Sequence, residues 1–321
     1  MKKIIIALKK TVRATQFFKE INQDGYRQLK ALPMWRNFFG HESTHLESDI
    51  IRLYHVIEKG LCMPEFRSRF GSGSIRQLQE SLKRWDGEQT TQVESGWRVL
   101  QAYAARHAEM GVDISDILDL PLAIPSSCIN QGEGGTRGFS RIEEADKAAF
   151  LRVFSSRSSM RHFDPTRIPS TEAIKEAVNV SLRTPSVCNR QTWRVHSYAG
   201  EDAQKLLALQ NGNRGFGQTI PHVLVVTSDL RFFTGTSERY QSWIDGGMFS
   251  MSLLLALHAG GLGAISLNWS VLNRQDRALR AAADIPGHER IIMLIGCGYP
   301  VEKSQVPVSS RRSPKDILTC H

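Results

Sequence analysis

Two stretches of this sequence decide how its second half is interpreted: Arg157-Ser158-Ser159-Met160-Arg161-His162-Phe163 and Pro185-Ser186-Val187-Cys188-Asn189-Arg190-Gln191-Thr192-Trp193. The first gathers two guanidiniums and two hydroxyls in one short segment. Planar guanidinium forks and hydroxyl donors together suit the oxygens of a phosphate group. The second stretch predicts a rigid Pro-Ser turn followed by amide side chains. Basic-serine clusters also occur on solvated surfaces, so each stretch alone is weak evidence for a phosphate site.

The composition is that of a globular protein. The chain has 321 residues, of which 41% are hydrophobic and 23% charged, and its formal net charge is +9. Such a chain can bury a sizeable core and predicts two domains, or one large domain with an elaboration. The basic residues are dispersed, and no run of Lys or Arg exceeds two residues. This dispersion favours solubility and anionic cofactors over nucleic-acid binding.

Cysteine usage and hydropathy argue against two classes of protein, those held by disulfides or thiolate zinc sites and those that span a membrane. The five cysteines are scattered, without a CxxC pair, so neither a disulfide framework nor a thiolate zinc site is predicted. The apolar runs Ile4 to Leu8 and Leu253 to Leu257 are far too short to span a bilayer. The basic start of the chain lacks the apolar length and the cleavage site of a signal peptide. We therefore expect a cytoplasmic protein without a membrane span.

Residues 1 to about 120 read as helical, since their apolar residues recur close to a 3.6-residue period. Ser48 or Asp49 is a candidate N-cap for the segment 48–59, and Gly60 a candidate stop. A loop containing the glycine-rich segment 132–138 follows, and we interpret it as a linker, because no P-loop Lys-Ser/Thr follows the glycines. The other helices predicted here are 75–85 and 91–110.

The second half mixes helices and strands. Short β-branched or alternating runs predict strands at 193–198, 221–227, 264–267 and 290–296. Helices are predicted at 142–155, 170–182 with a cap at Ser170 or Thr171, and 245–259. Long helices between the strands indicate an α+β protein and not a regular βαβ relay.

Five segments in order resemble the signature of the FMN-dependent nitroreductase family. Residues 157–163 match Arg-Arg-Ser-x-Arg-x-Phe with Ser158 for the second Arg, and 185–193 match Pro-Ser-x-x-Asn-x-Gln-Pro-Trp with Thr192 for Pro. The remaining matches are Asn213, the Gly-Leu-Gly segment 261–269, and Arg-x-Pro at 312–314. The resemblance covers roughly residues 145 to 318.

This resemblance implies the fold and the organisation of the chain. The family fold is α+β, a three-layer α/β/α arrangement with a central, mostly antiparallel sheet. Here an α-helical N-terminal extension, residues 1–140, would precede an FMN-binding domain, residues 141–321. The resemblance also implies a homodimer with the flavin site at the subunit interface.

The resemblance further implies which residues bind FMN. The phosphate and ribityl chain would be held by Arg157, Ser159, Arg161 and Arg312. The partner subunit would contribute Pro185, Ser186 and Asn189, and Asn213 would hydrogen-bond the pyrimidine edge. The segment 266–269 would line the ring. The full predicted set is Arg157, Ser158, Ser159, Arg161, Pro185, Ser186, Val187, Asn189, Gln191, Asn213, Ser266, Leu267, Asn268, Trp269, Arg311 and Arg312.

The implied activity is oxidoreductase chemistry in a ping-pong cycle. NAD(P)H would reduce the flavin, and an organic acceptor, such as a nitro compound or a quinone, would then reoxidise it through flavin N5. Donors near N1 would stabilise the reduced flavin. No protein acid or base and no metal is predicted. Two alternatives remain open: a specialised flavin-dependent biosynthetic enzyme, and a flavin-binding sensor or scaffold, which the substitutions at Ser158 and Ser310 favour.

Three other candidates have plainer interpretations. His55 and Glu58 have the i, i+3 spacing of two metal ligands, but a surface or buried hydrogen bond is favoured. Cys188 fits a packing role better than a redox thiol. Asp245 could cap the helix 245–259 or, with Trp243, cover the pocket.

Overall fold

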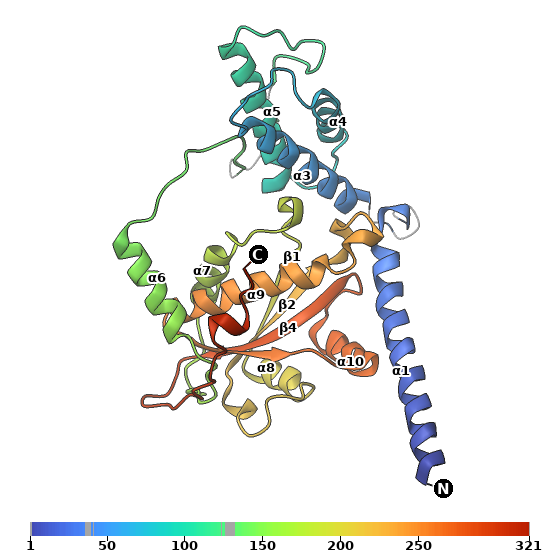
Figure 1. Ribbon diagram of the computed structural model, residues 1–321, viewed down its shortest axis with the longest axis vertical. Helices are drawn as coiled ribbons and strands as arrows, with labels where there is room; N and C mark the ends of the chain where they lie inside the picture. The colour runs from blue at the N-terminus through green and yellow to red at the C-terminus, as the bar shows by residue number, and fades with distance from the viewer. Residues whose placement is uncertain (1, 36–39, 41, 123, 126–131, 321) are drawn as a thin grey trace.

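The computed structural model describes residues 2–35, 40, 42–122, 124–125 and 132–320 (Figure 1). Cys128, and with it part of the predicted loop that contains the glycine-rich segment, lies outside these residues. The first helices are α1 (Lys2–Ala31), α3 (Glu42–Leu61), α4 (Ser72–Lys83) and α5 (Thr91–Glu109). They are followed by α6 (Glu144–Ser156), α7 (Thr171–Ser181), β1 (Trp193–Ala199), α8 (Gly200–Leu207), β2 (His222–Asp229), α9 (Gln241–Ala259), β3 (Gly263–Asn268), α10 (Asn273–Ala283) and β4 (Glu289–Gly298).

A four-stranded sheet forms the centre of the C-terminal half. Its strand order is β1-β2-β4-β3, and every pair of neighbours is antiparallel. The β2–β4 register places Leu224 opposite Ile295 and shifts by one residue between Val226 and Thr227. Because β3 is an edge strand, most of its outer backbone groups have no partner strand among the described residues.

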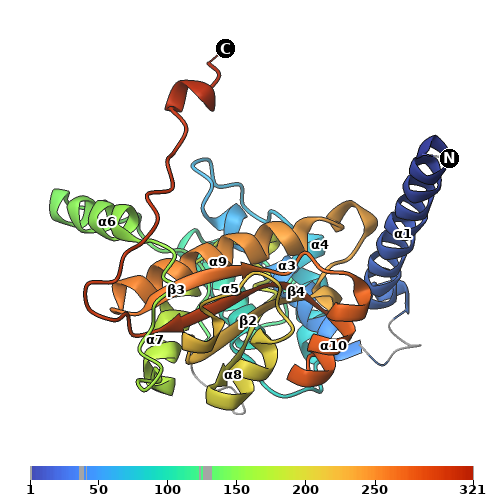
Figure 2. The ribbon, with the colours of Figure 1, turned by 90° about the horizontal axis from the view of Figure 1, so that it is seen from below.

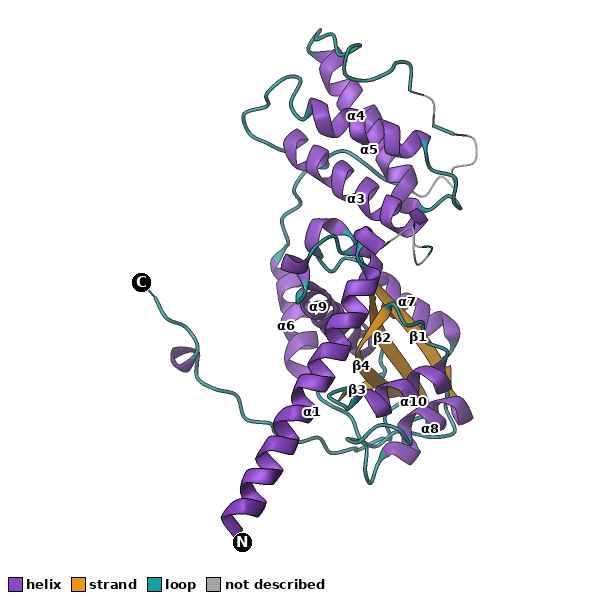
Figure 3. Ribbon diagram, turned by 90° about the vertical axis from the view of Figure 1, so that its right-hand side faces the viewer, coloured by secondary structure: helices purple, strands orange, loops and turns teal. Residues whose placement is uncertain are grey.

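Helices cover both faces of this sheet. On one face, α8 and α10 pack on Val223, Val225 and Leu294. On the other, α7 and α9 pack on Leu224, Val226 and Ile295 (Figure 3). Strands that are buried on both faces read as continuous apolar runs, which explains the Val-Leu-Val-Val sequence of β2. The three-layer α/β/α fold predicted from the resemblance is confirmed.

The helices α3, α4 and α5 have a core of their own. Ile50, Ile57, Leu78 and Leu100 are fully buried in it, and Phe232 enters it from the C-terminal half. The helix α1 takes no part in this core. It lies beside α10, and its last residue, Ala31, packs with Leu230 and Phe233; its first turns project from the body (Figures 1 and 2). The division of the chain at residue 140 stays a prediction.

Several predicted helix ends differ from the observed ones. Neither Ser48 nor Asp49 is an N-cap, because α3 begins at Glu42; Ser48 is buried and donates a 2.7 Å hydrogen bond to the Phe232 carbonyl. Gly60 does not end α3, which runs one residue further. Ser170 is confirmed as the N-cap of α7, since its hydroxyl accepts from the Ala173 N–H. The helices α8 and α10 were not predicted.

Glycines of the 132–138 segment let the chain run close to α5. A Cβ on Gly134 would lie 2.7 Å from both the backbone nitrogen and Cγ2 of Val99. A Cβ on Gly132 would meet Glu94 in the same way. The linker interpretation is therefore incomplete, since these glycines also provide a packing surface for the helix.

Gly134→Ala is expected to lower the free energy of unfolding by about 1–3 kcal/mol, because the α5 backbone cannot move away from an added methyl. Gly138→Ala is the matched control, since a methyl added there would have no described atom within 4 Å. Urea unfolding followed by circular dichroism measures both. Equal midpoints for the two variants would contradict close packing at Gly134.

No helix within the described ranges is long and apolar enough to cross a membrane. Among the same residues, no group of three or more His, Cys, Asp or Glu side chains could hold a metal ion. His55 and Glu58 form an i, i+3 pair, with Nδ1 and Oε2 3.7 Å apart.

Candidate functional site

Two of the predicted basic residues are held against the first residues of β3. Ser159 forms a parallel bridge with Ala264, and the Met160 N–H donates to the Ala264 carbonyl at 3.0 Å. This pairing fixes the chain between Arg157, at the C-terminal end of α6, and Arg161. Arg161 Nη1 donates to the Ser159 carbonyl at 3.2 Å, and its guanidinium carbon lies 5.7 Å from the centre of the Phe216 ring.

Neither guanidinium has an acidic partner among the described residues. Arg157 and Arg161 form no ion pair with any carboxylate of the described chain. His258 lies next to this segment, with its Nε2 2.8 Å from the Ser156 hydroxyl. Burial lowers the pKa of His258, and the charge of Arg157 lowers it further.

Asn213 lies in the loop after α8, near Phe216. Its amide nitrogen donates to the Leu207 carbonyl at 2.7 Å and to the Gln210 carbonyl at 3.0 Å. These bonds close the end of α8 and occupy both amide hydrogens. The Asn213 carbonyl accepts from the N–H groups of Phe216 and Gly217, so only Oδ1 and the backbone N–H remain for a flavin. Its predicted contact with the pyrimidine edge stays a prediction.

The far end of β3 borders a cavity of about 690 Å³. Ser266 and Asn268 are exposed, whereas Leu267 and Trp269 are buried, because alternate residues of a strand face opposite ways. The indole N–H of Trp269 donates to Asp276 at 3.1 Å. Besides Asn268 and Trp269, the lining of the cavity includes Trp243, Met293 and four residues of α1: Gln16, Phe17, Glu20 and Asp24.

The Pro-Ser segment 185–193 has an unusual backbone. Cys188, Asn189 and Gln191 have φ values of 49°, 56° and 50°, the left-handed region that residues other than glycine rarely adopt. The Ser186 hydroxyl accepts from the Gln191 N–H at 3.0 Å, and the Gln191 amide donates to Asn189 Oδ1 at 3.2 Å. Strained backbone of this kind is typical of functional sites.

The segment is held from two sides. The Val187 N–H donates to Asp245 at 3.2 Å, so Asp245, in the second turn of α9, is an anchor and not the predicted cap. From α3, the buried hydroxyl of Tyr54 accepts a 3.5 Å bond from the Asn189 amide and donates to Gln92. Burial raises the pKa of Tyr54 far above its usual range, so this hydroxyl stays protonated.

Within one chain, the predicted site residues fall into two groups that do not meet. The group around Arg157 lies beside His258, near the end of α9, whereas the Pro-Ser segment contacts Asp245, near its beginning. Thirteen residues of helix separate these anchors, which corresponds to about 20 Å. Arg311 and Arg312 join neither group, since both are exposed on the C-terminal segment that leaves the body (Figure 2).

Sequence reasoning missed several residues of these sites. Tyr54 and the α1 residues Phe17 and Glu20 lie far outside the matched motifs, and their positions depend on tertiary contacts. For His258 the sequence offered one weak indication of a functional role, a histidine in the last turn of an apolar helix.

Comparisons with known proteins match the C-terminal half of the chain, where the sequence motifs lie. Residues 154–211 and 199–299 match the model of the Nitroreductase family. An NADH dehydrogenase of Thermus thermophilus is 24% identical over 178 residues, which cover 46% of this chain and 84% of that protein.

Solved structures resemble the same region. A Nitroreductase Family Protein from Streptococcus pneumoniae is 19% identical, with a TM-score of 0.47, and the match covers 54% of this chain and all of that one, 100%. A structure from Desulfovibrio desulfuricans, in complex with FMN, is 22% identical, with a TM-score of 0.46, and the match covers 53% of this chain and 95% of that one.

Proposed function

We propose, on the premise that this chain belongs to the nitroreductase family through residues 154–299, that it is an FMN-dependent oxidoreductase. NAD(P)H would be the reductant and a small organic molecule, of the nitro or quinone kind, the acceptor. The proposal joins the family match to the geometry around β3. Its reductant, its acceptor and the roles of individual residues are our inference.

One observation carries the proposal: two guanidiniums without acidic partners in the described chain lie at the start of an open edge strand. Arg157 and Arg161 flank Ser159, whose bridge to Ala264 fixes their position. Unpaired guanidiniums and hydroxyls fit a phosphate monoester, which carries close to two negative charges and three acceptor oxygens. The residues present therefore fit the phosphate end of FMN.

The rest of β3 fits the ring end of the same cofactor. From Gly263 to Asn268 the strand leads from the arginines to the cavity beside Trp243 and Met293. Its exposed edge offers backbone N–H groups, and the apolar lining offers a surface for planar rings. When bound, FMN would supply hydride transfer between the nicotinamide and the acceptor. The chain itself would hold the phosphate, present donors to the ring edge and exclude water from the cavity.

The exposed face of α9 suggests that the Pro-Ser segment of the flavin site comes from a second copy of the chain. The helix is apolar all round, and such helices are normally buried on every side. One face packs on the sheet, but Ile244 and Met248 on the opposite face are 52% and 38% exposed. A two-fold partner on this face would bury them and could bring its own Asn189 to the flavin, since within one chain Asn189 and Arg157 lie at opposite ends of α9.

The decisive experiment is to add FMN to the purified protein, remove the excess, and record the absorption spectrum anaerobically with NADH or NADPH. A retained flavin band that bleaches on addition of either nucleotide is the expected result. Failure to take up FMN would overturn the proposal. Flavin that binds but resists both nucleotides would favour a sensor, or an enzyme with another reductant.

A further inference from the structure

A second cavity lies further along α1 than the cavity beside Asn268, here called the flavin-side cavity, and has a strongly basic lining. Its volume is about 450 Å³, within the range of small-molecule sites. The helix α1 contributes Tyr26, Arg27 and Lys30, and the C-terminal half contributes Asn273, Arg277 and His288. No acidic residue is part of this lining among the residues that the structure describes.

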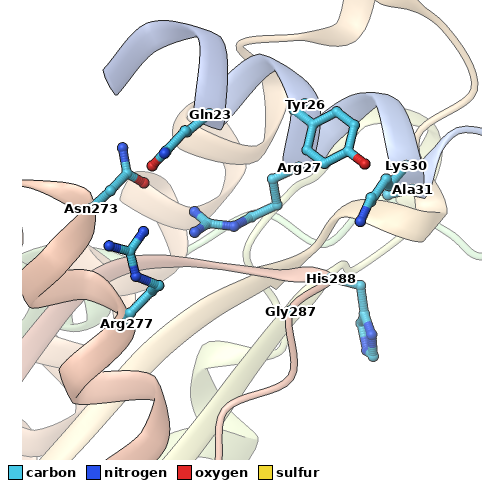
Figure 4. A pocket seen from close by; sticks show the side chains of 9 residues that line it. All are labelled: Gln23, Tyr26, Arg27, Lys30, Ala31, Asn273, Arg277, Gly287 and His288. Atoms are coloured by element: carbon cyan, nitrogen blue, oxygen red, sulfur yellow. The ribbon is translucent and has the colours of Figure 1, made fainter. Parts of the chain in front are cut away.

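The two arginines of the cavity face the same space. Figure 4 shows the guanidiniums of Arg27 and Arg277 pointing toward each other, beside the amides of Gln23 and Asn273. Arg277, on α10, forms no hydrogen bond or ion pair with any residue that the structure describes. Like charges repel, so this arrangement gains stability from an anion between them.

The acidic groups nearby do not neutralise this charge. Arg27 Nη2 pairs with Asp276 at 2.8 Å, but Asp276 is shared with Arg280, also at 2.8 Å. Asp24 lies 3.5 Å from Arg27 and is largely exposed. One buried carboxylate therefore serves two guanidiniums, and the carboxylate of Glu20 is bonded to the backbone N–H and the amide of Asn273. Arg277 is exposed and has no carboxylate partner among the described residues.

Residues of α1 connect this cavity to the flavin-side cavity. Between the two lies a small cavity of about 70 Å³. It shares Arg27 and Asn273 with the basic cavity, and Glu20 and Asp24 with the cavity beside Asn268. Ten residues of helix separate Phe17 from Arg27, a distance of about 15 Å.

We propose that the basic cavity binds a phosphate-bearing small molecule through Arg27, Lys30 and Arg277. Arginine forks and the amide of Gln23 are donors of the kind that phosphate oxygens accept, whereas the amide of Asn273 already donates to Glu20. Two sources supply this chemistry, a free phosphate compound and the 2′-phosphate of NADPH. The second source rests on the proposed function, because its nicotinamide would have to reach the flavin-side cavity.

The test uses the full-length protein with two variants. Arg277→Gln removes the unpaired charge, and Arg274→Gln is the matched control, since Arg274 is exposed on the same helix and does not line the cavity. Calorimetric titration with adenosine 2′,5′-bisphosphate requires no flavin. We expect binding that weakens with salt and falls about tenfold or more in Arg277→Gln, as for the loss of one charged hydrogen-bonding group. Arg274→Gln should bind as the wild type does.

Three results separate the possibilities. Equal binding of the bisphosphate by the wild type and Arg277→Gln, or no binding by either, would overturn the site. A KM that rises for NADPH but not for NADH in Arg277→Gln would assign the phosphate to the reductant. Loss of bisphosphate binding with an unchanged KM for NADPH would assign the site to a free phosphate compound. Because the titration does not depend on FMN, its outcome is independent of whether the oxidoreductase proposal holds.

Discussion

A chain carrying Ile244→Glu and Met248→Glu is expected to be monomeric and to lose FMN. Both side chains lie on the face of α9 that no described element covers. A two-fold interface over this face would bury four new carboxylates without partners, and burying unpaired charges costs several kcal/mol. Without the partner's Pro-Ser segment, the flavin would lose several hydrogen bonds, each worth about 1 kcal/mol, so its affinity should fall on the order of 100-fold.

Sedimentation equilibrium and fluorescence titration with FMN measure the two effects on the same samples. The control carries Ala281→Glu and Ala282→Glu, which add the same charge at exposed positions of α10. It should keep the mass and the FMN affinity of the wild type. A monomeric glutamate variant that still binds FMN tightly would show that one chain suffices for the site.

Arg161→Ala is expected to weaken FMN binding about ten- to hundredfold. Hydrogen bonds to charged groups contribute about 1.5–3 kcal/mol, and 1.4 kcal/mol corresponds to a factor of ten in affinity. The backbone around Arg161 is fixed by the strand contact at Ala264, so the substitution should remove a ligand and not the fold. Arg161→Lys should recover part of the affinity, because lysine retains the charge but lacks the planar fork.

Quenching of FMN fluorescence gives the dissociation constants. Arg167→Ala is the matched control, since Arg167 is also exposed and also lies over a ring, 4.1 Å from the centre of Tyr299. It is expected to bind FMN as the wild type does. If Arg161→Ala retained wild-type affinity, the phosphate end of the site would have to lie elsewhere.

Most of the secondary structure was predictable because its signals are local. The β-branched run of β2 and the apolar repeats of α5 and α9 identify these elements without tertiary contacts. Element ends were less predictable. The helix α9 begins at Gln241, four residues before Asp245, and the role of Asp245 as the anchor of Val187 has no local signature. The eight residues of α8 are too few for a period to be visible.

The sequence alone determined the family motifs, because each motif lies within one short segment. Residues 157–163 contain the basic and hydroxyl groups that suit a phosphate, and residues 185–193 form the strained turn. Only the tertiary structure decided how these segments relate. It set them at opposite ends of α9, since a helix of fixed rise separates their anchors. It also brought Tyr54 to Asn189 and α1 to α10. Packing between residues far apart in the chain determines such contacts, and the periodicity of a single segment does not predict them.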